Sequence, residues 1–516
     1  MLRHALLTLS AALLYTISLP PFGYGLAGFL VATPLTLLLL NPSQPLRPAG
    51  AWATGLAFGE AATLAVGGHW LYLAAHEFFG KPPAFSLGFT LLTTVTHAGA
   101  FIGAGVALSA SFVKLRSPYA RAVAFAATWV ALELSRARLL YGCPWNFLGH
   151  ALEPYPALLG AVTYGGVYAL SAACVLAGSL VGEALLATES RAKLGMLGVA
   201  LAVPASLYLL PPSQLATGRA DAVTTRNSLT VGLVQPGVGR HDLWNPAMRS
   251  RHLAQLLELS RSHELQGADL IIWPENAVPF LLDADTDARD EIAKLAREMG
   301  AYVMTGAPRS ENRPDGTAAF YNSVYLFPPD GGAYHVYDKA KLLPYVEATP
   351  AFARKVLPRT SGIEYTPGRG RAYFHVHGWR IAPLVCFEST YPEISREAAF
   401  AGADLLVNVS NDSWFDRGAA PEQHFGMTVF RAAETQLPLV RVANTGVSAV
   451  VEPSGKVALA LPARASAIAR YEIQRAHTPE LATFYVRWGD VFAWGCVVLA
   501  AAGGVLASRR RSDASS

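Results

Sequence analysis

The first 212 residues of the chain consist almost entirely of apolar segments separated by short loops. A membrane-spanning helix needs about 20 mostly apolar residues. This rule predicts seven spans before the polar part of the chain and one after it, at 4–19, 24–41, 51–75, 85–113, 119–135, 157–187, 194–212 and 489–507. The stretch "SLPPFGYG" after the first span is a turn. Since no small-residue cleavage site leads into a polar domain there, we do not expect a cleaved signal peptide.

Residues 226–480 follow a different pattern, in which short apolar runs alternate with polar turns. Helical patterns such as "TDARDEIAKLAREMG" lie between the first of these runs. The alternation predicts a mixed sheet with helices on its faces. The runs with the composition of buried strands are "LTVGLVQPGV", "ADLIIWPENAV", "AYVMTGAPR", "NSVYLFPPDGG", "WRIAPLVCFES", "ADLLVNVSNDSWF" and "PLVRVANTGVSAVVEPSG".

The sequence therefore predicts three parts. A transmembrane domain covers 1–212, an α/β domain covers 226–480, and a final transmembrane helix covers 489–507. The polar segment from Pro211 to Ser228 is predicted to be a linker between the first two.

The composition supports a membrane protein. Charged residues make up 15% of the chain and hydrophobic residues 52%, whereas a soluble domain carries about 25% charged residues. The net charge of +4 is spread along the chain without a long basic run, so we expect no nucleic-acid partner. The four cysteines show neither paired metal-ligand spacing nor a disulfide framework; they are Cys143, Cys174, Cys386 and Cys496.

Basic residues in the short loops predict the orientation in the membrane. With eight spans, most of them fall on one side, which we expect to be the cytoplasm. Both termini would then be cytoplasmic and the 226–480 domain extracytoplasmic, and an error of one span would invert this assignment. The basic residues on the cytoplasmic side would be Arg3, Arg47, Lys114, Arg116, Arg121, Arg191, Lys193 and Arg509 to Arg511, against Lys81, Arg136 and Arg138 on the other.

Residues with chemical potential stand at the ends of predicted strands. Glu275 follows "IIWP", "YDKAKLLPYVE" supplies Lys339 and Glu347, and "LVCFES" supplies Cys386 and Glu388. A thiol is weakly ionised at neutral pH and gains nucleophilicity from a neighbouring base or cation. A carboxylate could accept its proton, and an ammonium could lower the pKa of the thiol and stabilise an oxyanion.

Each of these residues also has a structural interpretation. A lone cysteine in an apolar strand is usually a small buried hydrophobe, and Lys339 could be a solvated lysine. Asn408 and Asn411 are most often turn or cap formers. Arg441 could line a site or belong to an ordinary strand. Only the ordered set of glutamate, lysine and cysteine favours a catalytic site.

That order, a "WPE" glutamate, a "YDKxxLLP" lysine and a "VCFE" cysteine, resembles the nitrilase superfamily. Together with the layout of the spans, the whole chain resembles its membrane branch, the apolipoprotein N-acyltransferase family. The resemblance implies an α-β-β-α sandwich joined to a polytopic helical membrane domain. It also implies catalytic roles for Glu275, Lys339 and Cys386. The supporting or substrate-binding positions that it implies are Glu347, Glu388, Phe387 and, from the loose match "RHDLWNP", Trp244.

Two positions depart from the family pattern. The family commonly has "PFGE" where this chain has "PYVE", and tyrosine where it has Phe387. Glu347 survives the first change, so the loop can differ in shape and keep its carboxylate. The missing phenol hydroxyl argues against proton transfer at Phe387 and leaves a packing role.

The resemblance further implies a reaction. An acyl chain would pass from a membrane phospholipid to a thioester on Cys386. It would then pass to the α-amine of the diacylglyceryl-modified N-terminal cysteine of an apolipoprotein, in a bacterial inner membrane and without a metal or other cofactor. One alternative is a membrane-anchored nitrilase-like hydrolase, in which water resolves the thioester. Another is a transporter, for which Glu60, Glu133 and Glu183 would be the intramembrane charges.

Overall fold

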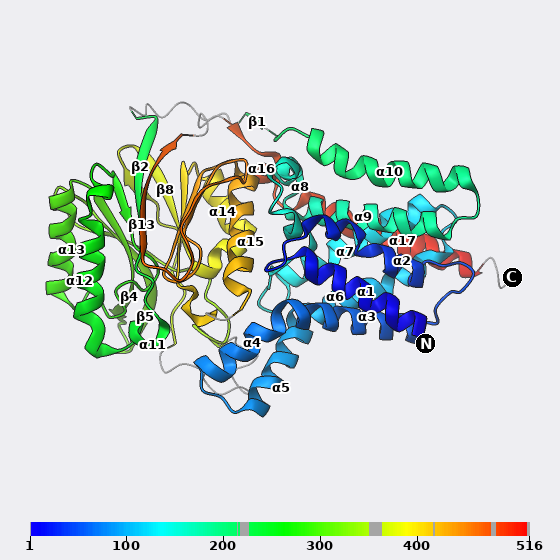
Figure 1. Ribbon diagram of the computed structural model, residues 1–516, viewed down its shortest axis with the longest axis horizontal. Coiled ribbons are helices and arrows are strands. Elements are labelled where there is room, and N and C mark those ends of the chain that lie inside the picture. The colour runs from blue at the N-terminus through cyan, green and yellow to red at the C-terminus, as the bar shows by residue number, and fades with distance from the viewer. Residues whose placement is uncertain are drawn as a thin grey trace. The chain divides into compact units, whose positions relative to one another are not determined.

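The computed structural model describes residues 2–213, 215–216, 226–349, 364–415, 418–475 and 481–512. The chain forms two compact units (Figure 1). The helical unit comprises Met1–Gln214, Arg417–Phe430 and Thr483–Ser516, and the α/β unit comprises Leu215–Asp416 and Arg431–Ala482. Most of the predicted linker 211–228 lies outside the described residues.

The helical unit is built from apolar helices joined by short turns (Figure 1). Its α-helices are α1 (Leu2–Ser18), α2 (Ala32–Leu39), α3 (Pro48–Thr63), α4 (His69–Leu73), α5 (Pro83–Thr94), α6 (Ala100–Ser109), α7 (Pro118–Arg138), α8 (Val162–Gly165), α9 (Val167–Leu186), α10 (Ser190–Leu209), α16 (Phe484–Trp488) and α17 (Val491–Ser512). Three π-helical turns, Leu64–Gly68, Ala74–Phe78 and Val95–Gly99, continue α3, α4 and α5.

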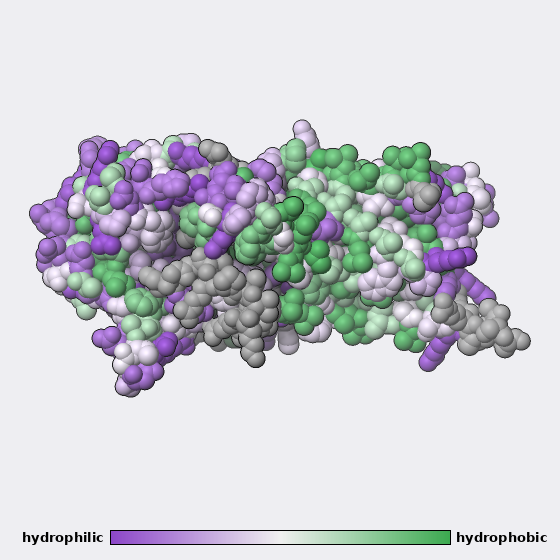
Figure 2. All heavy atoms as spheres, turned by 90° about the horizontal axis from the view of Figure 1, so that it is seen from below, coloured by the Kyte–Doolittle hydropathy of each residue, from purple (hydrophilic) through white to green (hydrophobic). Residues whose placement is uncertain are grey.

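Several helices of this unit are suited to cross a membrane. Figure 2 shows apolar side chains gathered over the surface of the helical unit, whereas hydrophilic residues predominate on the α/β unit. This confirms the predicted helical membrane domain, while the count of eight spans stays a prediction. Among the described residues, four helical segments are long and apolar enough to span, namely Pro83–Lys114, Val167–Leu186, Ser190–Leu209 and Val491–Arg509, and Leu2–Ser18 and Gly25–Leu39 are shorter apolar helices.

The predicted span 157–187 differs from the structure at its start. Gly166 has φ 62 and separates the short α8 from α9, so the long helix begins at Val167. Glycine adopts positive φ without steric cost, and the apolar pattern on both sides of it conceals the break.

Three buried or half-buried carboxylates of the helical unit have hydrogen-bond partners inside it. Glu183 on α9 accepts a hydrogen bond of 2.7 Å from Arg121 Nε on α7, and Glu60 accepts one of 2.7 Å from the Thr94 hydroxyl. Glu133 accepts from the Leu148 backbone N–H at 2.9 Å. These contacts give the intramembrane carboxylates a structural explanation, because a buried charge is stable only when it is paired or hydrogen-bonded.

Close helix packing in this unit depends on glycines four residues apart. Gly55 and Gly59 on α3 meet Gly99, which ends the π-helical turn before α6, and Gly103 on α6. A Cβ at Gly55 would lie 2.2 Å from the Gly103 carbonyl oxygen, and a Cβ at Gly59 would lie 2.2 Å from that of Gly99. Small residues at this spacing share one helix face and let two backbones approach, so α3 and α6 pack with little between them.

The α/β unit contains two six-stranded sheets. In the first, with strand order β13-β2-β3-β4-β5-β6, strands β2, β3 and β4 are parallel. In the second, with order β12-β11-β10-β9-β8-β7, strands β8, β9 and β10 are parallel. Their bounds are β2 (Ser228–Gln235), β3 (Leu270–Ile272), β4 (Tyr302–Asn312), β5 (Ala318–Phe327), β6 (His335–Asp338), β7 (Phe374–Val376), β8 (Trp379–Val385), β9 (Leu405–Ser410), β10 (Leu439–Ala443), β11 (Ala449–Val451), β12 (Val457–Ala460) and β13 (Ala467–Gln474); β1 (Leu215–Ala216) pairs with β14 (Leu481–Ala482).

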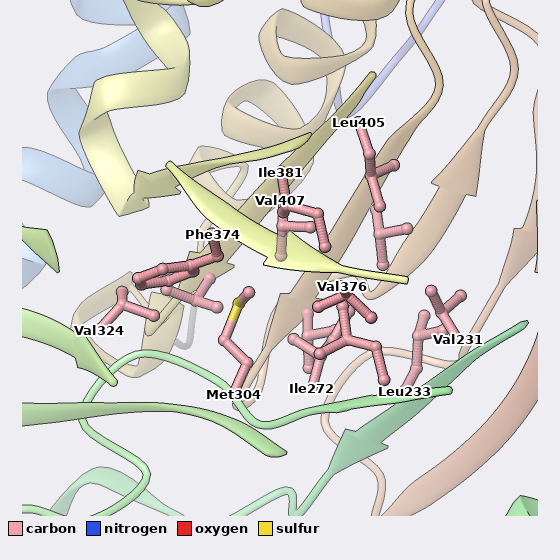
Figure 3. Packing of buried hydrophobic residues seen from close by; sticks show 14 of the residues in the cluster. Val231, Leu233, Ile272, Met304, Val324, Phe374, Val376, Ile381, Leu405 and Val407 are labelled. Carbon is pink, nitrogen blue, oxygen red and sulfur yellow. The ribbon is translucent and has the colours of Figure 1, made fainter. Parts of the chain in front are cut away.

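The two sheets pack face to face over one hydrophobic core. Figure 3 shows Val231, Leu233 and Ile272 of the first sheet directed toward Val376 and Val407 of the second. Alternate residues of each strand point into this core, since side chains alternate between the faces of a strand. The opposite faces are therefore available to helices and to polar residues.

Helices complete the sandwich. On the outer face of the first sheet, α12 (Arg249–Ser260) and α13 (Thr286–Met299) bury Leu256, Ile292 and Leu295 against Ile271 and Val303. Asp285 caps the start of α13 by accepting from the Ala288 N–H, as expected for an N-cap aspartate. The remaining helices are α11 (Arg240–Leu243), α14 (Pro392–Phe400), which covers the second sheet, and α15 (Ala420–Thr435). The predicted α-β-β-α sandwich is confirmed.

Candidate active site

Cys386 stands on a sharp turn at the end of β8. Its φ is 52, in the left-handed region, which costs a non-glycine residue about 1–2 kcal/mol. A short 3-10 helix, Cys386–Thr390, starts at this residue. Strained conformations of this kind persist where the surrounding structure enforces them, often at functional sites. The turn leaves Cys386 buried, with 9% of its surface exposed.

Glu275 lies beside the Cys386 thiol. Its Oε1 accepts a hydrogen bond of 2.7 Å from Asn322 Nδ2, and its Oε2 accepts one of 2.8 Å from the Asn411 backbone N–H. The Cys386 side chain and this carboxyl group act on each other's pKa. Gly306 on β4 makes room for the segment, because a Cβ there would lie 2.6 Å from the Glu275 Cα. The carboxyl group is therefore fixed within reach of the thiol proton.

Lys339 directly follows β6 and is almost completely buried. Its Nζ lies 2.9 Å from Glu347 Oε1 and 3.7 Å from Glu275 Oε1. Burial by itself lowers the pKa of Lys339, but the charges of Glu347, Glu275 and Cys386 outweigh it and raise that pKa above its ordinary value. Lys339 is therefore a permanent cation in the site at neutral pH.

Burial is also the main reason why the pKa of Glu275 is raised; the charge of Glu347 raises it further and that of Lys339 lowers it. Burial likewise raises the pKa of Cys386, followed by the charges of Glu275 and Asp412, while Lys339 lowers it. The expected lowering of the thiol pKa by an ammonium is present, but burial and the carboxylates outweigh it, so the pKa of Cys386 is raised overall. The thiol is protonated at rest, and its proton must leave as the sulfur attacks.

Glu347 holds the lysine in place. Its carboxylate accepts from Lys339, from Asn322 Nδ2 at 2.7 Å and from the Leu343 backbone N–H at 2.6 Å. The Asn322 amide thus bridges Glu347 and Glu275. The loop with the sequence "PYVE" therefore positions the Glu347 carboxylate in contact with Lys339.

Glu388 is fully buried and has a full set of donors. The Tyr337 hydroxyl lies 2.9 Å from Oε1, and the N–H groups of Ala340 and Lys341 lie 2.8 and 3.0 Å from the same oxygen. The Val385 N–H donates to Oε2 at 2.8 Å. Glu388 therefore ties the loop after Lys339 to the last residue of β8, immediately before Cys386.

The two remaining predicted residues lie outside this hydrogen-bonded cluster. Phe387 is buried and packs edge-on against Tyr391, with ring centroids 5.2 Å apart. Trp244 follows α11 and is 37% exposed. The structure thus brings together Glu275, Lys339, Cys386, Glu347 and Glu388, while the ring of Phe387 packs against Tyr391 and Trp244 is partly exposed.

Comparison with known proteins supports the assignment of both units. The family model for carbon-nitrogen hydrolases matches residues 230–483, and that for the apolipoprotein N-acyltransferase N-terminal domain matches residues 11–180. Apolipoprotein N-acyltransferase of Geobacter metallireducens is 35% identical over 76% of this chain and 75% of its own length. Those of Azotobacter vinelandii and Brucella melitensis are 32% and 30% identical, over 98% and 99% of this chain and 95% and 97% of their own lengths.

The chain belongs to the apolipoprotein N-acyltransferase family. This membership makes it a membrane-bound acyltransferase with a carbon-nitrogen hydrolase fold. Family membership does not favour either alternative considered from the sequence, a membrane-anchored nitrilase-like hydrolase or a transporter. The family models span both units, so the helical unit is part of the enzyme and not an unrelated anchor.

Two residues of the N-acyltransferase cluster could not be assigned from the sequence. Asn322 lies within β5 and Tyr337 within β6, in runs that predict only buried strand. The available signal was a polar amide in the middle of the apolar run "FYNSVYLF". Asn408, which we expected to form a turn or cap, lies inside β9 and donates to the Cys386 carbonyl at 3.3 Å.

Proposed function

We propose that this chain transfers a fatty acyl group from a membrane phospholipid to the N-terminal amine of diacylglyceryl-modified apolipoproteins. Glu275, Lys339 and Cys386 are its catalytic residues in this proposal. The observation that carries it is a cysteine on a strained turn next to the Glu275 carboxyl group and the Lys339 ammonium, whose charges both act on the thiol, in a member of the N-acyltransferase family.

The first half-reaction forms a thioester. Glu275 removes the Cys386 proton as the sulfur attacks the ester carbonyl carbon of the phospholipid. The carbonyl oxygen becomes an oxyanion, which the ammonium of Lys339 stabilises. The carbon–oxygen bond to the glycerol then breaks, and the leaving oxygen takes the proton from Glu275. A lysophospholipid departs and the acyl group stays on the sulfur.

The second half-reaction transfers the acyl group to nitrogen. The α-amine of the acceptor attacks the thioester carbon, and Glu275 accepts a proton from this amine. The carbon–sulfur bond breaks, the amide forms, and the proton returns to the Cys386 sulfur. The raised pKa of Glu275 suits both steps, because a base accepts and returns a proton best when its pKa lies near the working pH.

Two further carboxylates, Glu347 and Glu388, hold the catalytic groups in position. Glu347 holds the Lys339 ammonium, and Glu388 joins the lysine loop to the cysteine turn. In this proposal neither carboxylate acts as a second base, since Glu347 is paired with the Lys339 ammonium and Glu388 accepts from Tyr337 and three backbone N–H groups. Trp244, partly exposed, would contact the substrate instead of the reacting atoms.

Both substrates carry long acyl chains, which explains why the catalytic residues belong to a membrane protein. We propose that residues 1–212 and 489–507 form the membrane domain in the bacterial inner membrane, and that residues 226–480 lie on its extracytoplasmic side. The exposed apolar side chains of α10 and α17, such as Leu201, Leu209 and Val498, suit contact with lipid. Orientation rests on the basic residues of the short loops.

Mass spectrometry of the purified protein after incubation with phospholipid alone tests the first half-reaction. We expect the mass of one acyl group on the peptide that contains Cys386, and no adduct in a Cys386→Ala variant. Adding a diacylglyceryl peptide with a free N-terminal amine should discharge the thioester and acylate the peptide. Transfer to the peptide without any adduct on Cys386 would contradict the thioester scheme. Discharge into buffer at the same rate would favour the hydrolase.

A further inference from the structure

Arg441 is a fully buried arginine in the middle of the second sheet of the α/β unit. It lies on β10, between Val440 and Val442, whose side chains enter the core between the two sheets. Because side chains alternate along a strand, Arg441 points to the opposite face of the sheet. The register places it beside Asn408 of β9, which in turn lies beside Leu384 of β8.

One set of contacts leads from Arg441 to the nucleophile. Its guanidinium Nη1 donates a hydrogen bond to Asn408 Oδ1. The amide nitrogen of Asn408 donates to the Leu384 carbonyl at 3.1 Å and to the Cys386 carbonyl at 3.3 Å. The guanidinium therefore fixes which way the Asn408 amide faces, and that amide holds the backbone of the strained turn.

A second set of contacts leads from Arg441 to the base. Its Nη2 donates to Asp412 Oδ2 at 2.7 Å and to Ser410 Oγ at 3.2 Å. Ser410 also donates to the other oxygen of Asp412 at 2.9 Å. Between these two residues the Asn411 N–H donates to Glu275 Oε2 at 2.8 Å. The loop that orients the carboxylate of Glu275 is thus fastened by the same guanidinium.

We infer that Arg441 is a positioning residue for the acyl transfer proposed above, which holds the Cys386 turn through Asn408 and the Glu275 carboxylate through the 410–412 loop. A buried ion pair seldom stabilises a fold more than well-packed apolar side chains would, so stability alone does not explain a charge in a central strand. Arginine suits the task because its planar fork reaches several acceptors at fixed angles. A lysine would offer its three donors from a single nitrogen and lacks this planar fork.

The rate at which iodoacetamide alkylates Cys386 tests this inference without any phospholipid, so the result does not depend on the acyl-transfer proposal. We expect Arg441→Met to slow alkylation by about tenfold to a hundredfold, because misplaced groups lose this much reactivity. Arg441→Met/Asp412→Asn should be slow as well, and it leaves no unpaired charge if the single variant does not fold. Arg475→Met is the matched control, since Arg475 pairs with Asp404 at 2.5 Å just before β9, at the other end of that strand.

A double-mutant cycle with Glu275→Gln separates positioning from a general loss of structure. If Arg441 acts by bringing the base to the thiol, Arg441→Met should slow alkylation far less in the Glu275→Gln background than in the wild-type background. Equal slowing in both backgrounds would overturn the inference, and so would wild-type alkylation in Arg441→Met/Asp412→Asn. Arg475→Met should alkylate at the wild-type rate, and thermal unfolding in detergent should show all compared variants folded.

Discussion

At the scale of single residues, the site combines a fixed cation with two groups that resist ionisation. Lys339 keeps its proton because two carboxylates surround it, whereas burial raises the pKa of both Glu275 and Cys386. The thiol therefore cannot be a preformed thiolate, and catalysis depends on the carboxylate that accepts its proton. This links the rate directly to the protonation state of Glu275.

The pH dependence of Cys386 acylation should show this link. As the pH falls through the raised pKa of Glu275, the carboxylate gains a proton and can no longer act as the base. We therefore expect the single-turnover acylation rate to fall on the acid side with a midpoint above pH 4.5, which is the ordinary pKa of a glutamate side chain. Lys339 stays protonated over this range, because its pKa is raised. An acid limb at or below the ordinary value would contradict the role of Glu275.

Phe387 allows a test of the position where this chain departs from its family. Its ring packs against Tyr391 and has no proton to transfer, so an apolar replacement should preserve chemistry and cost some packing. We expect Phe387→Leu to retain Cys386 acylation and to lower the free energy of unfolding by about 1 kcal/mol. Loss of acylation in a folded Phe387→Leu variant, together with acceleration in Phe387→Tyr, would show that the missing hydroxyl matters.

At the scale of elements, the Lys339 loop depends on a close approach of two backbone segments. Gly368 donates its N–H to the Lys339 carbonyl at 2.8 Å, and a Cβ at Gly368 would lie 2.2 Å from the Asp338 carbonyl oxygen. We expect Gly368→Ala to displace Lys339 and to slow Cys386 acylation by about tenfold or more. Gly370 is the matched control two residues away, where a Cβ would meet nothing within 4 Å. Equal acylation rates in the two alanine variants would show that the loop tolerates the shift.

The sequence predicted the elements of the α/β unit better than their mutual contacts. Runs rich in valine, isoleucine and leucine identified β2, β8 and β9, because buried strands need such residues. The partners of Glu388 were not predictable, since the Tyr337 hydroxyl and the backbone N–H groups after Lys339 meet it only through tertiary folding. The net rise of the Cys386 pKa was not predictable for a similar reason. It depends on burial and on Asp412, which the linear pattern does not reveal.

At the scale of the whole molecule, the two units do not follow the order of the chain. Residues 418–430, which include most of α15, belong to the helical unit. There Gln423 donates to the carbonyls of Pro20 and Val66, and its oxygen accepts from the indole N–H groups of Trp70 and Trp145. Domain boundaries drawn along the sequence assign this segment to the α/β domain, because residues of the α/β unit flank it on both sides.

The membrane orientation can be tested without knowing the total number of spans. Thr188 lies in the exposed turn between α9 and α10, and Asp315 lies in the exposed turn between β4 and β5. Along the chain, α10 is the one described helix long and apolar enough to span between them, so the two positions should face opposite sides of the membrane. By the positive-inside rule, Arg191 and Lys193 beside Thr188 predict that this turn faces the cytoplasm.

We therefore expect opposite labelling of two cysteine reporters in intact spheroplasts. In a Cys143→Ser/Cys386→Ala background, which removes the one native cysteine that is not buried and the thiol expected to react with alkylating reagents, Asp315→Cys should react with a membrane-impermeant maleimide and Thr188→Cys should not. Both should react once detergent opens the membrane, which controls for exposure. The reverse pattern would place the α/β unit in the cytoplasm, where it could not meet lipoproteins on the outer face. Labelling of both reporters in intact spheroplasts would show that α10 does not span.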